Sequence, residues 1–154
     1  MAERRLGLIM HGVTGRMGYN QHLVRSILAI RDQGGIALST GDRLVVDPII
    51  VGRDADKIER LAKKHDIKRW SADLDAALAN PDDTVFFDAG TTLMRASLIE
   101  KALAAGKHVY CEKPTSDSLD IAVNLAKTAR ASGLKHGVVQ DKLFLPGLMK
   151  LKML

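Results

Sequence analysis

The sequence predicts an α/β protein, built as a doubly wound parallel sheet of about six strands with helices on both faces. Short apolar runs alternate with amphipathic helical segments about six times along the chain. The first apolar run leads into a turn that contains Gly12, Gly15 and Gly18. Aromatic residues make up only 4% of the chain, and this favours an aliphatic core of buried parallel strands and their covering helices.

Length, charge and cysteine content narrow the function classes. The 154 residues suit one domain, 1–154, with its own hydrophobic core. The net charge is +5, but the basic residues are scattered and form no stripe interleaved with aromatics, so we expect no nucleic-acid partner. No apolar stretch approaches the roughly 20 residues of a membrane span, so we expect no membrane partner. A single cysteine, Cys111, allows no internal disulfide and favours a cytoplasmic protein.

The first predicted strand, Leu6–Met10, leads directly into the glycine turn, and an amphipathic helical segment extends from there to Ile30. This succession places the free N–H groups and the positive dipole end of a helix where they can bind a phosphate. The spacing is G-x-x-G-x-x-G rather than G-x-G-x-x-G, so a glycine turn without a ligand remains the alternative. The predicted cofactor-binding residues of this turn are Gly12, Val13, Thr14, Gly15, Arg16, Met17 and Gly18.

The rest of the chain continues the alternation of strands and helices. The glycine-punctuated loop Gln33–Arg43 is long for a connection and has room for a short hairpin. Later strands are expected at Val45–Val51, Ile67–Trp70, Thr84–Asp88, His108–Cys111 and Gly137–Gln140. Helices are expected at Asp54–His65 with Asp54 as N-cap, in the segment that Ser71 caps and Pro81 ends, at Arg95–Ala105 and at Ser118–Ser132. A final segment begins near Leu145.

Four segments with ligand-binding chemistry follow predicted strands. Parallel strands bring their carboxyl ends to one edge of a sheet, and ligands of doubly wound sheets bind at that edge. We therefore expect the glycine turn to lie beside the exits Gly52-Arg53-Asp54, Gly90-Thr91-Thr92 and Glu112-Lys113-Pro114.

The exit of the second long strand predicts the cofactor. Sites for NAD place an acidic residue there, whereas sites for NADP supply an arginine to the 2′-phosphate. Arg53 ends this strand, and a guanidinium suits a phosphate through bidentate hydrogen bonds, with Arg16 as a second contact. The prediction is NADP, with NAD as the alternative, because Asp54 could bind a ribose. Alternatively, Arg53 pairs with Asp54 or Asp56 at the surface.

Lys113 is the predicted catalytic residue. A lysine at a strand end beside the nicotinamide can hydrogen-bond a substrate hydroxyl and assist proton transfer during hydride transfer. Pro114 restricts Lys113 to an extended backbone and makes a cis bond possible. Glu112 could orient the lysine or the nicotinamide ribose. A surface turn with a salt bridge is the alternative for this segment.

The histidines and the single cysteine offer further candidate residues. None of the five histidines has metal-type spacing with other ligands, so no metal site is predicted. His11 borders the glycine turn, where a cofactor role is one of its options. His108 in a predicted strand and Cys111 beside Glu112 are interpreted as core residues.

The glycine turn, the strand order and the string Gly106-Lys107-His108-Val109-Tyr110-Cys111-Glu112-Lys113-Pro114 resemble the N-terminal domain of the Gfo/Idh/MocA oxidoreductases. This resemblance implies a Rossmann domain that binds NAD(P), with Lys113 in the place of the family's catalytic lysine. It places Thr91 and Thr92 in the loop that touches the cofactor. Arg95 lies near a position that is often histidine in the family, and Gln140-Asp141-Lys142 replaces an N-x-R-like segment.

The resemblance also implies a second domain. The family normally adds a C-terminal domain that supplies most of the substrate pocket and the oligomer interface, and this chain stops at Leu154 inside what resembles the linking helix. We therefore expect a small-molecule substrate, a sugar, cyclitol or related polyol or carbonyl compound, and a homo-oligomer formed through that domain, with little turnover by this chain alone. Two alternatives remain: a dihydrodipicolinate-reductase-like enzyme, whose glycine turn is similar, and a non-catalytic nucleotide-sensing or partner-binding module.

Overall fold

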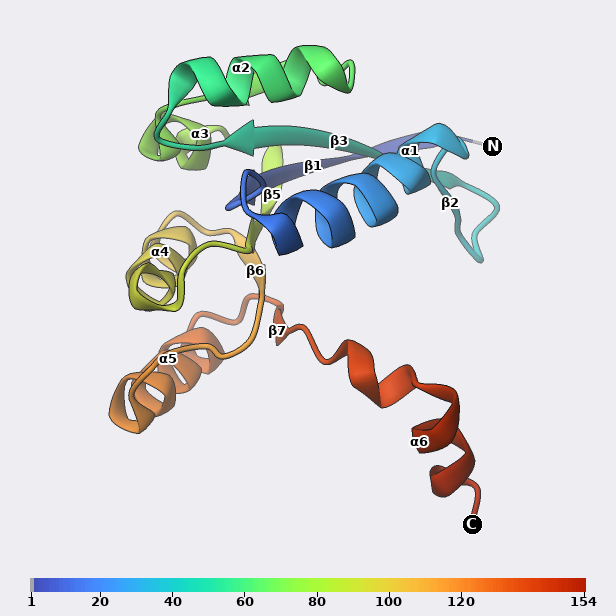
Figure 1. The fold of residues 1–154 in the computed structure, drawn as a ribbon, viewed down its shortest axis with the longest axis vertical. Coiled ribbons are helices and arrows are strands. Elements are labelled where there is room, and N and C mark those ends of the chain that lie inside the picture. Colours follow the sequence, from blue (N-terminus) through green and yellow to red (C-terminus); the bar gives the residue numbers. More distant parts are fainter. Residues whose placement is uncertain (1) are drawn as a thin grey trace.

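The computed structural model describes residues 2–154, and it contains one seven-stranded sheet (Figure 1). The strand order is β2-β3-β1-β5-β6-β7, and β4, which lies outside this order, pairs with β3. All pairs are parallel except that of β2 with β3. The strands are β1 Glu3–His11, β2 Ile36–Ala37, β3 Arg43–Val51, β4 Arg69–Ser71, β5 Asp83–Asp88, β6 His108–Cys111 and β7 His136–Val138. The six parallel strands confirm the predicted doubly wound sheet.

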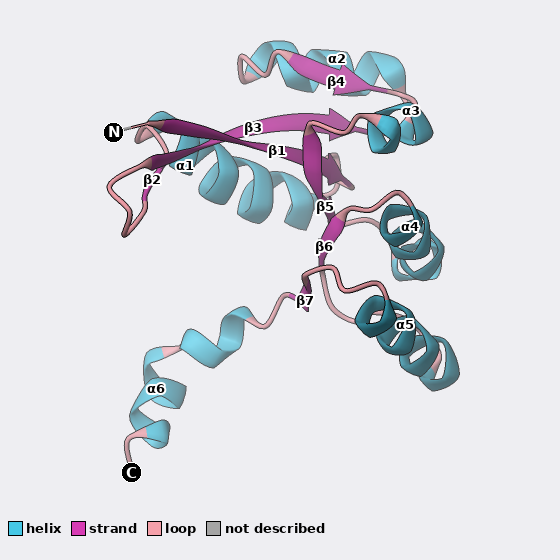
Figure 2. Cartoon of the chain, turned by 180° about the vertical axis from the view of Figure 1, so that it is seen from behind, coloured by secondary structure: helices cyan, strands magenta, loops and turns pink. Residues whose placement is uncertain are grey.

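Helices cover both faces of the sheet (Figure 2). Along β1 the side chains alternate: Leu8 and Met10 pack in one core cluster, and Ile9 packs in the other. The cluster of Leu8 and Met10 includes residues of helices η1, Gly18–Leu28, and α2, Ala55–Lys64. The cluster of Ile9 includes residues of α3, Leu74–Ala79, α4, Thr92–Ala104, and α5, Leu119–Ala131.

The carboxyl ends of the parallel strands form one continuous row. His11 at the end of β1 is in register with Val51 of β3 and Asp88 of β5. Asp88 is in register with Cys111 of β6, Cys111 with Val138 of β7, and Val51 with Ser71 of β4. The segments that follow these strands therefore lie along the same edge of the sheet, as the sequence predicts.

Several local features differ from the prediction. The first helix is a π-helix, η1, that continues as α1, Ala29–Asp32. Ser71 does not cap α3: it ends β4, and Asp73 is the N-cap, its carboxylate accepting from the Ala76 N–H at 3.0 Å. The short strand expected at Ile67–Trp70 is β4, Arg69–Ser71, and Ile67, 6% exposed, packs in the core before it. The predicted hairpin in Gln33–Arg43 is confirmed, since β2 pairs antiparallel with the start of β3.

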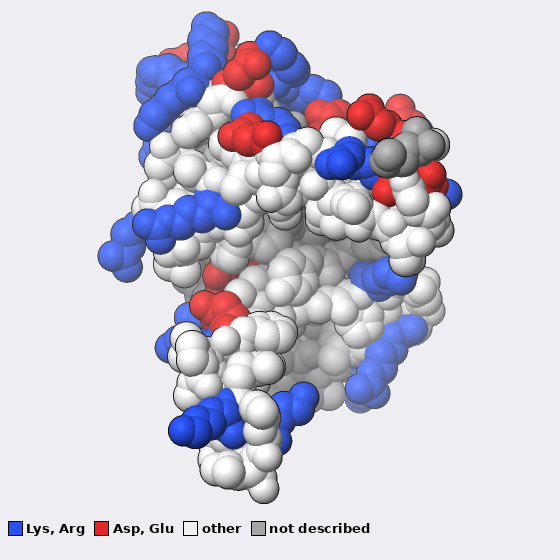
Figure 3. Space-filling model, turned by 90° about the vertical axis from the view of Figure 1, so that its right-hand side faces the viewer, with Lys and Arg blue, Asp and Glu red and all other residues white. Residues whose placement is uncertain are grey.

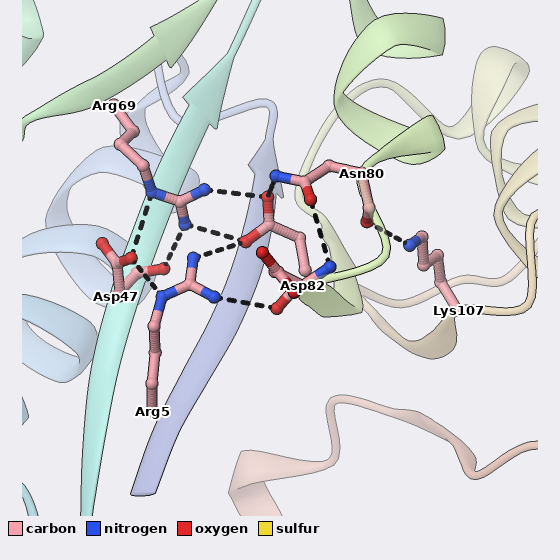
Figure 4. A network of polar contacts seen from close by, with 7 residues as sticks. Arg5, Asp47, Arg69, Asn80, Asp82 and Lys107 are labelled. Atoms are coloured by element: carbon pink, nitrogen blue, oxygen red, sulfur yellow. Dashed lines mark hydrogen bonds and ion pairs between the residues drawn. The ribbon is translucent and has the colours of Figure 1, made fainter.

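A network of ion pairs lies away from the glycine turn, where β4 and β5 begin (Figure 4). Its centre is Asp83, a fully buried residue at the start of β5. Both Nη1 and Nη2 of Arg69 donate to this carboxylate at 2.8 Å, and Arg5 and Asn80 donate at 3.0 and 3.1 Å. Burial raises the pKa of Asp83, but the hydrogen bonds from Arg69 and Arg5 outweigh it and lower the pKa below its ordinary value. The network thus joins β1, β4 and β5 at the edge away from the glycine turn.

The chain leaves the sheet after β7. The 3₁₀ turn η2, Asp141–Phe144, and helix α6, Pro146–Lys152, extend away from the sheet (Figure 1). Between this arm and η1, one face of the sheet is hollowed and mainly uncharged (Figure 3), with Phe87, Tyr110 and Val139 among its lining residues. Across residues 2–154, no helix combines the length and the apolar character that crossing a membrane requires.

Candidate functional site

The glycine turn packs tightly against the strand ends. Gly12 has φ +79°, and a Cβ there would lie 2.2 Å from the Gly90 nitrogen, so a side chain has no room. A Cβ on Gly18 would lie 2.3 Å from the Gly12 carbonyl oxygen, so this glycine lets η1 begin directly against the turn. Gly15 meets no comparable obstacle: its Cβ would lie 3.4 Å from the Gly12 oxygen. Within the protein, therefore, sterics demand glycine at 12 and 18 and not at 15.

An open hollow lies at the carboxyl edge of the sheet, and we name it the glycine-turn hollow. It is bounded by the glycine turn, by the exit of β3 and by the exit of β5. Eight of the predicted cofactor residues line it: Gly12, Thr14, Gly15, Arg16, Met17, Arg53, Gly90 and Thr91. The structure therefore gathers residues far apart in the sequence around a single open space.

The other predicted residues lie outside this lining. Val13 is fully buried and packs in the core, and Gly18 is buried beneath the turn. The Asp54 carboxylate caps α2 and accepts from the Lys57 N–H at 3.0 Å. Thr92 is the first residue of α4. Glu112 and Lys113 follow β6, further along the same edge.

Arg16 and Arg53 supply positive charge to the hollow. Both side chains are exposed, and within residues 2–154 neither takes part in an ion pair or a side-chain hydrogen bond. The predicted alternative, an ion pair of Arg53 with Asp54 or Asp56, is not formed. Two unpaired guanidinium groups beside a helix N-terminus favour an anionic ligand.

Asp88, the last residue of β5, is the buried centre of the site. Its carboxylate accepts from His11 Nδ1 at 2.7 Å, from the Gly90 N–H at 3.0 Å and from Arg95 Nε at 2.9 Å. Burial raises the pKa of Asp88, but the hydrogen bonds from His11, Gly90 and Arg95 outweigh it and lower the pKa below its ordinary value. Asp88 is therefore a carboxylate at neutral pH.

Arg95 connects the exits of β5 and β6. It is 2% exposed, and besides the bond to Asp88 it donates to the Gly90 carbonyl at 2.6 Å and to the Pro114 carbonyl. Asp88 accepts from the Gly90 N–H, so Asp88 and Arg95 together bind both the N–H and the carbonyl of Gly90. The sequence singled out Arg95 only by its position, and Asp88 only as a strand end.

Glu112 connects the β6 exit to the first helix. One carboxylate oxygen lies 2.6 Å from His22 Nε2 of η1, and the other accepts from the Lys113 N–H at 3.0 Å. Glu112 is 6% exposed, whereas the Lys113 side chain is exposed, and the Lys113-Pro114 bond is cis. Glu112 thus holds the backbone of Lys113 while the ammonium stays free to meet a ligand. No pattern in the sequence indicates the contact with His22, which lies ninety positions away.

The sequence interprets Cys111 and His108 as core residues, and the structure buries only the first of them. Cys111 is a core residue, 1% exposed, and burial raises the pKa of its thiol to about 11, so it is an unreactive thiol at neutral pH. His108 is only half-buried, and its Nδ1 accepts from the Lys135 N–H at 3.1 Å. No group of three or more metal-ligating side chains gathers anywhere in the described part of the chain.

A family model described as an oxidoreductase family with an NAD-binding Rossmann fold, Gfo/Idh/MocA, matches residues 10–140. The chain belongs to the Gfo/Idh/MocA family. Its sequence is 50% identical over 145 residues to D-xylose dehydrogenase of Paenarthrobacter nicotinovorans, a match that covers 94% of this chain and 37% of that protein. Membership favours the interpretation based on the Glu112-Lys113-Pro114 string over the dihydrodipicolinate-reductase-like alternative.

Solved structures share the Rossmann fold of this Gfo/Idh/MocA domain. An NAD binding oxidoreductase from Klebsiella pneumoniae has a TM-score of 0.77 at 24% identity, over 97% of this chain and 38% of the other. Apo scyllo-inositol dehydrogenase from Lactobacillus casei has a TM-score of 0.74 at 20% identity, over 99% of this chain and 41% of the other. The chain thus spans well under half the length of each of these relatives.

Proposed function

We propose that this Gfo/Idh/MocA domain binds NADP(H) for an oxidoreductase that acts on a sugar, cyclitol or related polyol or carbonyl compound. The observation that carries the proposal is the glycine-turn hollow, where the exits of β1, β3 and β5 meet beside the N-terminus of η1. A dinucleotide fits its chemistry: backbone N–H groups and the helix dipole suit the diphosphate.

The preference for NADP over NAD rests on the charges at the β3 exit. Arg53 and Arg16 have no anionic partner within residues 2–154, and a 2′-phosphate would supply one. Asp54, the residue that could instead accept from a ribose, already has one carboxylate oxygen bonded to the Lys57 N–H. NAD remains the alternative cofactor.

Lys113 is the proposed catalytic residue. The bound nicotinamide supplies or accepts the hydride, and the protein has to orient the substrate and exchange a proton with its oxygen. The backbone of Lys113 is held by Glu112, and the carbonyl of Pro114 is held by Arg95. Its exposed ammonium can then donate a hydrogen bond to the substrate oxygen and stabilise the developing alkoxide.

The proposed substrate class rests only on the sequence similarity of this chain to a relative. The relative that is 50% identical to this chain is named for D-xylose, a sugar with a chain of secondary hydroxyl groups. The substrate pocket and the oligomer interface are proposed to lie in a second domain, as the resemblance to the family implies.

Calorimetric titration of the chain with NADPH and with NADH tests the cofactor proposal. We expect saturable binding of both dinucleotides, with NADPH bound about tenfold or more tightly because of its 2′-phosphate. Fluorescence of Trp70, the single tryptophan, offers a second readout. Absence of saturable binding for both cofactors up to about millimolar concentration would overturn the proposal.

A further inference from the structure

A hydrogen bond to Asp88 orients the side chain of His11 in the lining of the glycine-turn hollow. It is the last residue of β1, its side chain is 14% exposed, and its ring lies against Gly90. Its Nδ1 lies 2.7 Å from Asp88 Oδ1. A carboxylate can only accept hydrogen bonds, so Nδ1 must carry the proton of this bond.

The other ring nitrogen, Nε2, is left without a partner. Across residues 2–154, the bond to Asp88 is the sole hydrogen bond of the His11 side chain. Because Nδ1 already carries a hydrogen, Nε2 of a neutral ring can only accept a hydrogen bond, and it becomes a donor when the ring is protonated.

The charges that face His11 come from four elements. Asp88 of β5 is its partner, and Arg95 of α4 is fully engaged by Asp88, Gly90 and Pro114. Arg16 of the glycine turn and Arg53 after β3 line the same hollow. Beyond Asp88 along the edge, Glu112 pairs with His22. The ring is thus bonded to one carboxylate, and Arg16 and Arg53 bring positive charge to the same hollow.

A diphosphate changes this balance. Its oxygens only accept hydrogen bonds at neutral pH, as does neutral Nε2, so the two groups can form a bond only when Nε2 carries a proton. The residue next to His11 is Gly12, which starts the turn proposed to bind the diphosphate. We propose that His11 binds the dinucleotide diphosphate as an imidazolium and takes up the necessary proton as the cofactor binds. This inference rests on the proposed function of the hollow.

Calorimetry with NADH measures this proton directly. NADH is the probe because its diphosphate does not titrate in the relevant range, whereas the 2′-phosphate of NADPH does. At about pH 7.5, above the ordinary titration range of histidine, titrations in phosphate and in Tris buffer give the number of protons taken up from the difference in observed enthalpy. We expect a fractional uptake of up to about one proton for the unaltered chain.

Three variants isolate the residue. His11→Asn keeps an amide that can donate to Asp88, and His11→Gln provides a second uncharged replacement. Both should abolish proton uptake. Between about pH 6 and about pH 8.5 the unaltered chain should lose about tenfold in NADH affinity, and both variants less than about twofold. His136→Asn, an exposed histidine at the amino end of β7, is the matched control and should behave like the unaltered chain.

Two failures are distinguishable. If neither NADH nor NADPH binds to the unaltered chain, the proposed function of the hollow fails, and this inference fails with it. If NADH binds but without proton uptake, or with the same uptake in both folded His11 variants, the role of His11 is overturned while the cofactor proposal stands. Circular dichroism establishes that the variants are folded.

Discussion

Arg95 Nε lies 2.9 Å from Asp88 Oδ2, and this fully buried ion pair joins α4 to the end of β5. Through the same two residues, the loop of Gly90 and the loop of Pro114 are fixed relative to each other. The pair is thus the internal support of the edge on which both proposed roles, cofactor binding and catalysis, depend.

Replacing Arg95 by methionine should destabilise the domain strongly. The methionine fills similar volume but leaves Asp88 buried without its cationic partner, and breaking such a pair costs about 3–5 kcal/mol. Urea unfolding followed by circular dichroism measures the loss. Arg130→Met, an exposed arginine of α5, is the control and should change stability by less than about 0.5 kcal/mol. Equal losses for both variants would contradict the central role of the pair.

Replacing Arg53 by alanine should reduce discrimination between the two cofactors. NADPH affinity should fall by about tenfold to a hundredfold, because a charge-assisted bond to the 2′-phosphate is worth about 1.5–3 kcal/mol. NADH affinity should change by less than about threefold, since NADH has no group for this arginine to bind. Calorimetry with each cofactor provides the comparison. A parallel loss for both would show that Arg53 contributes general positive charge and no selectivity.

Replacing Lys113 by alanine should remove turnover and spare cofactor binding. This chain can be grafted in place of the matching segment of the Paenarthrobacter D-xylose dehydrogenase, to which it is 50% identical. In an active chimera, Lys113→Ala should lower kcat by about a hundredfold or more, the usual contribution of a proton-transferring group, with a nearly unchanged cofactor Kd. Lys135→Ala, exposed before β7, is the control. Full activity of the Lys113 variant would exclude it as the catalytic residue.

Acid should weaken the network around Asp83. The pKa of this carboxyl is lowered in the folded state. Its stabilising contribution is therefore complete above the ordinary aspartate value of about 3.9, and it is lost as the pH falls below that value through the lower pKa of the folded state. Asp83→Asn removes the charge but leaves Arg5 and Arg69 in place, and should cost about 3 kcal/mol near pH 7. The difference between variant and unaltered chain should shrink as the pH is lowered toward 3, as urea unfolding at several pH values can measure. A difference independent of pH would argue that packing, and not charge, is lost.

Much of the fold could be predicted because β1 and its neighbours carry long apolar patterns. The rule for parallel sheets then predicts that the strand exits share one edge, and the register of His11, Val51 and Asp88 confirms it. The choice between two neighbouring candidate N-caps was harder to predict. Ser71 and Asp73 are both good N-caps two positions apart, and the end of β4 decides between them.

The buried polar contacts of the site could not be predicted from spacing. Asp88 ends an apolar strand and Arg95 lies in the first turns of a helix, so each is ordinary in its local context. Their importance arises from contacts with Pro114 and His11, which are distant in the sequence. His22 of η1 and Glu112, just after β6, likewise meet only because the fold brings them together.

Because the parallel strands end in register, the segments that meet a ligand are separate from the strands that form the core. His11, Val51, Asp88 and Cys111 end at one level, so the loop that follows each of them starts at the same edge of the sheet. Insertions or exchanges in those segments can retune which molecules are recognised without shifting any strand by a residue. A lineage built on this plan can therefore diversify its chemistry while inheriting an unaltered interior.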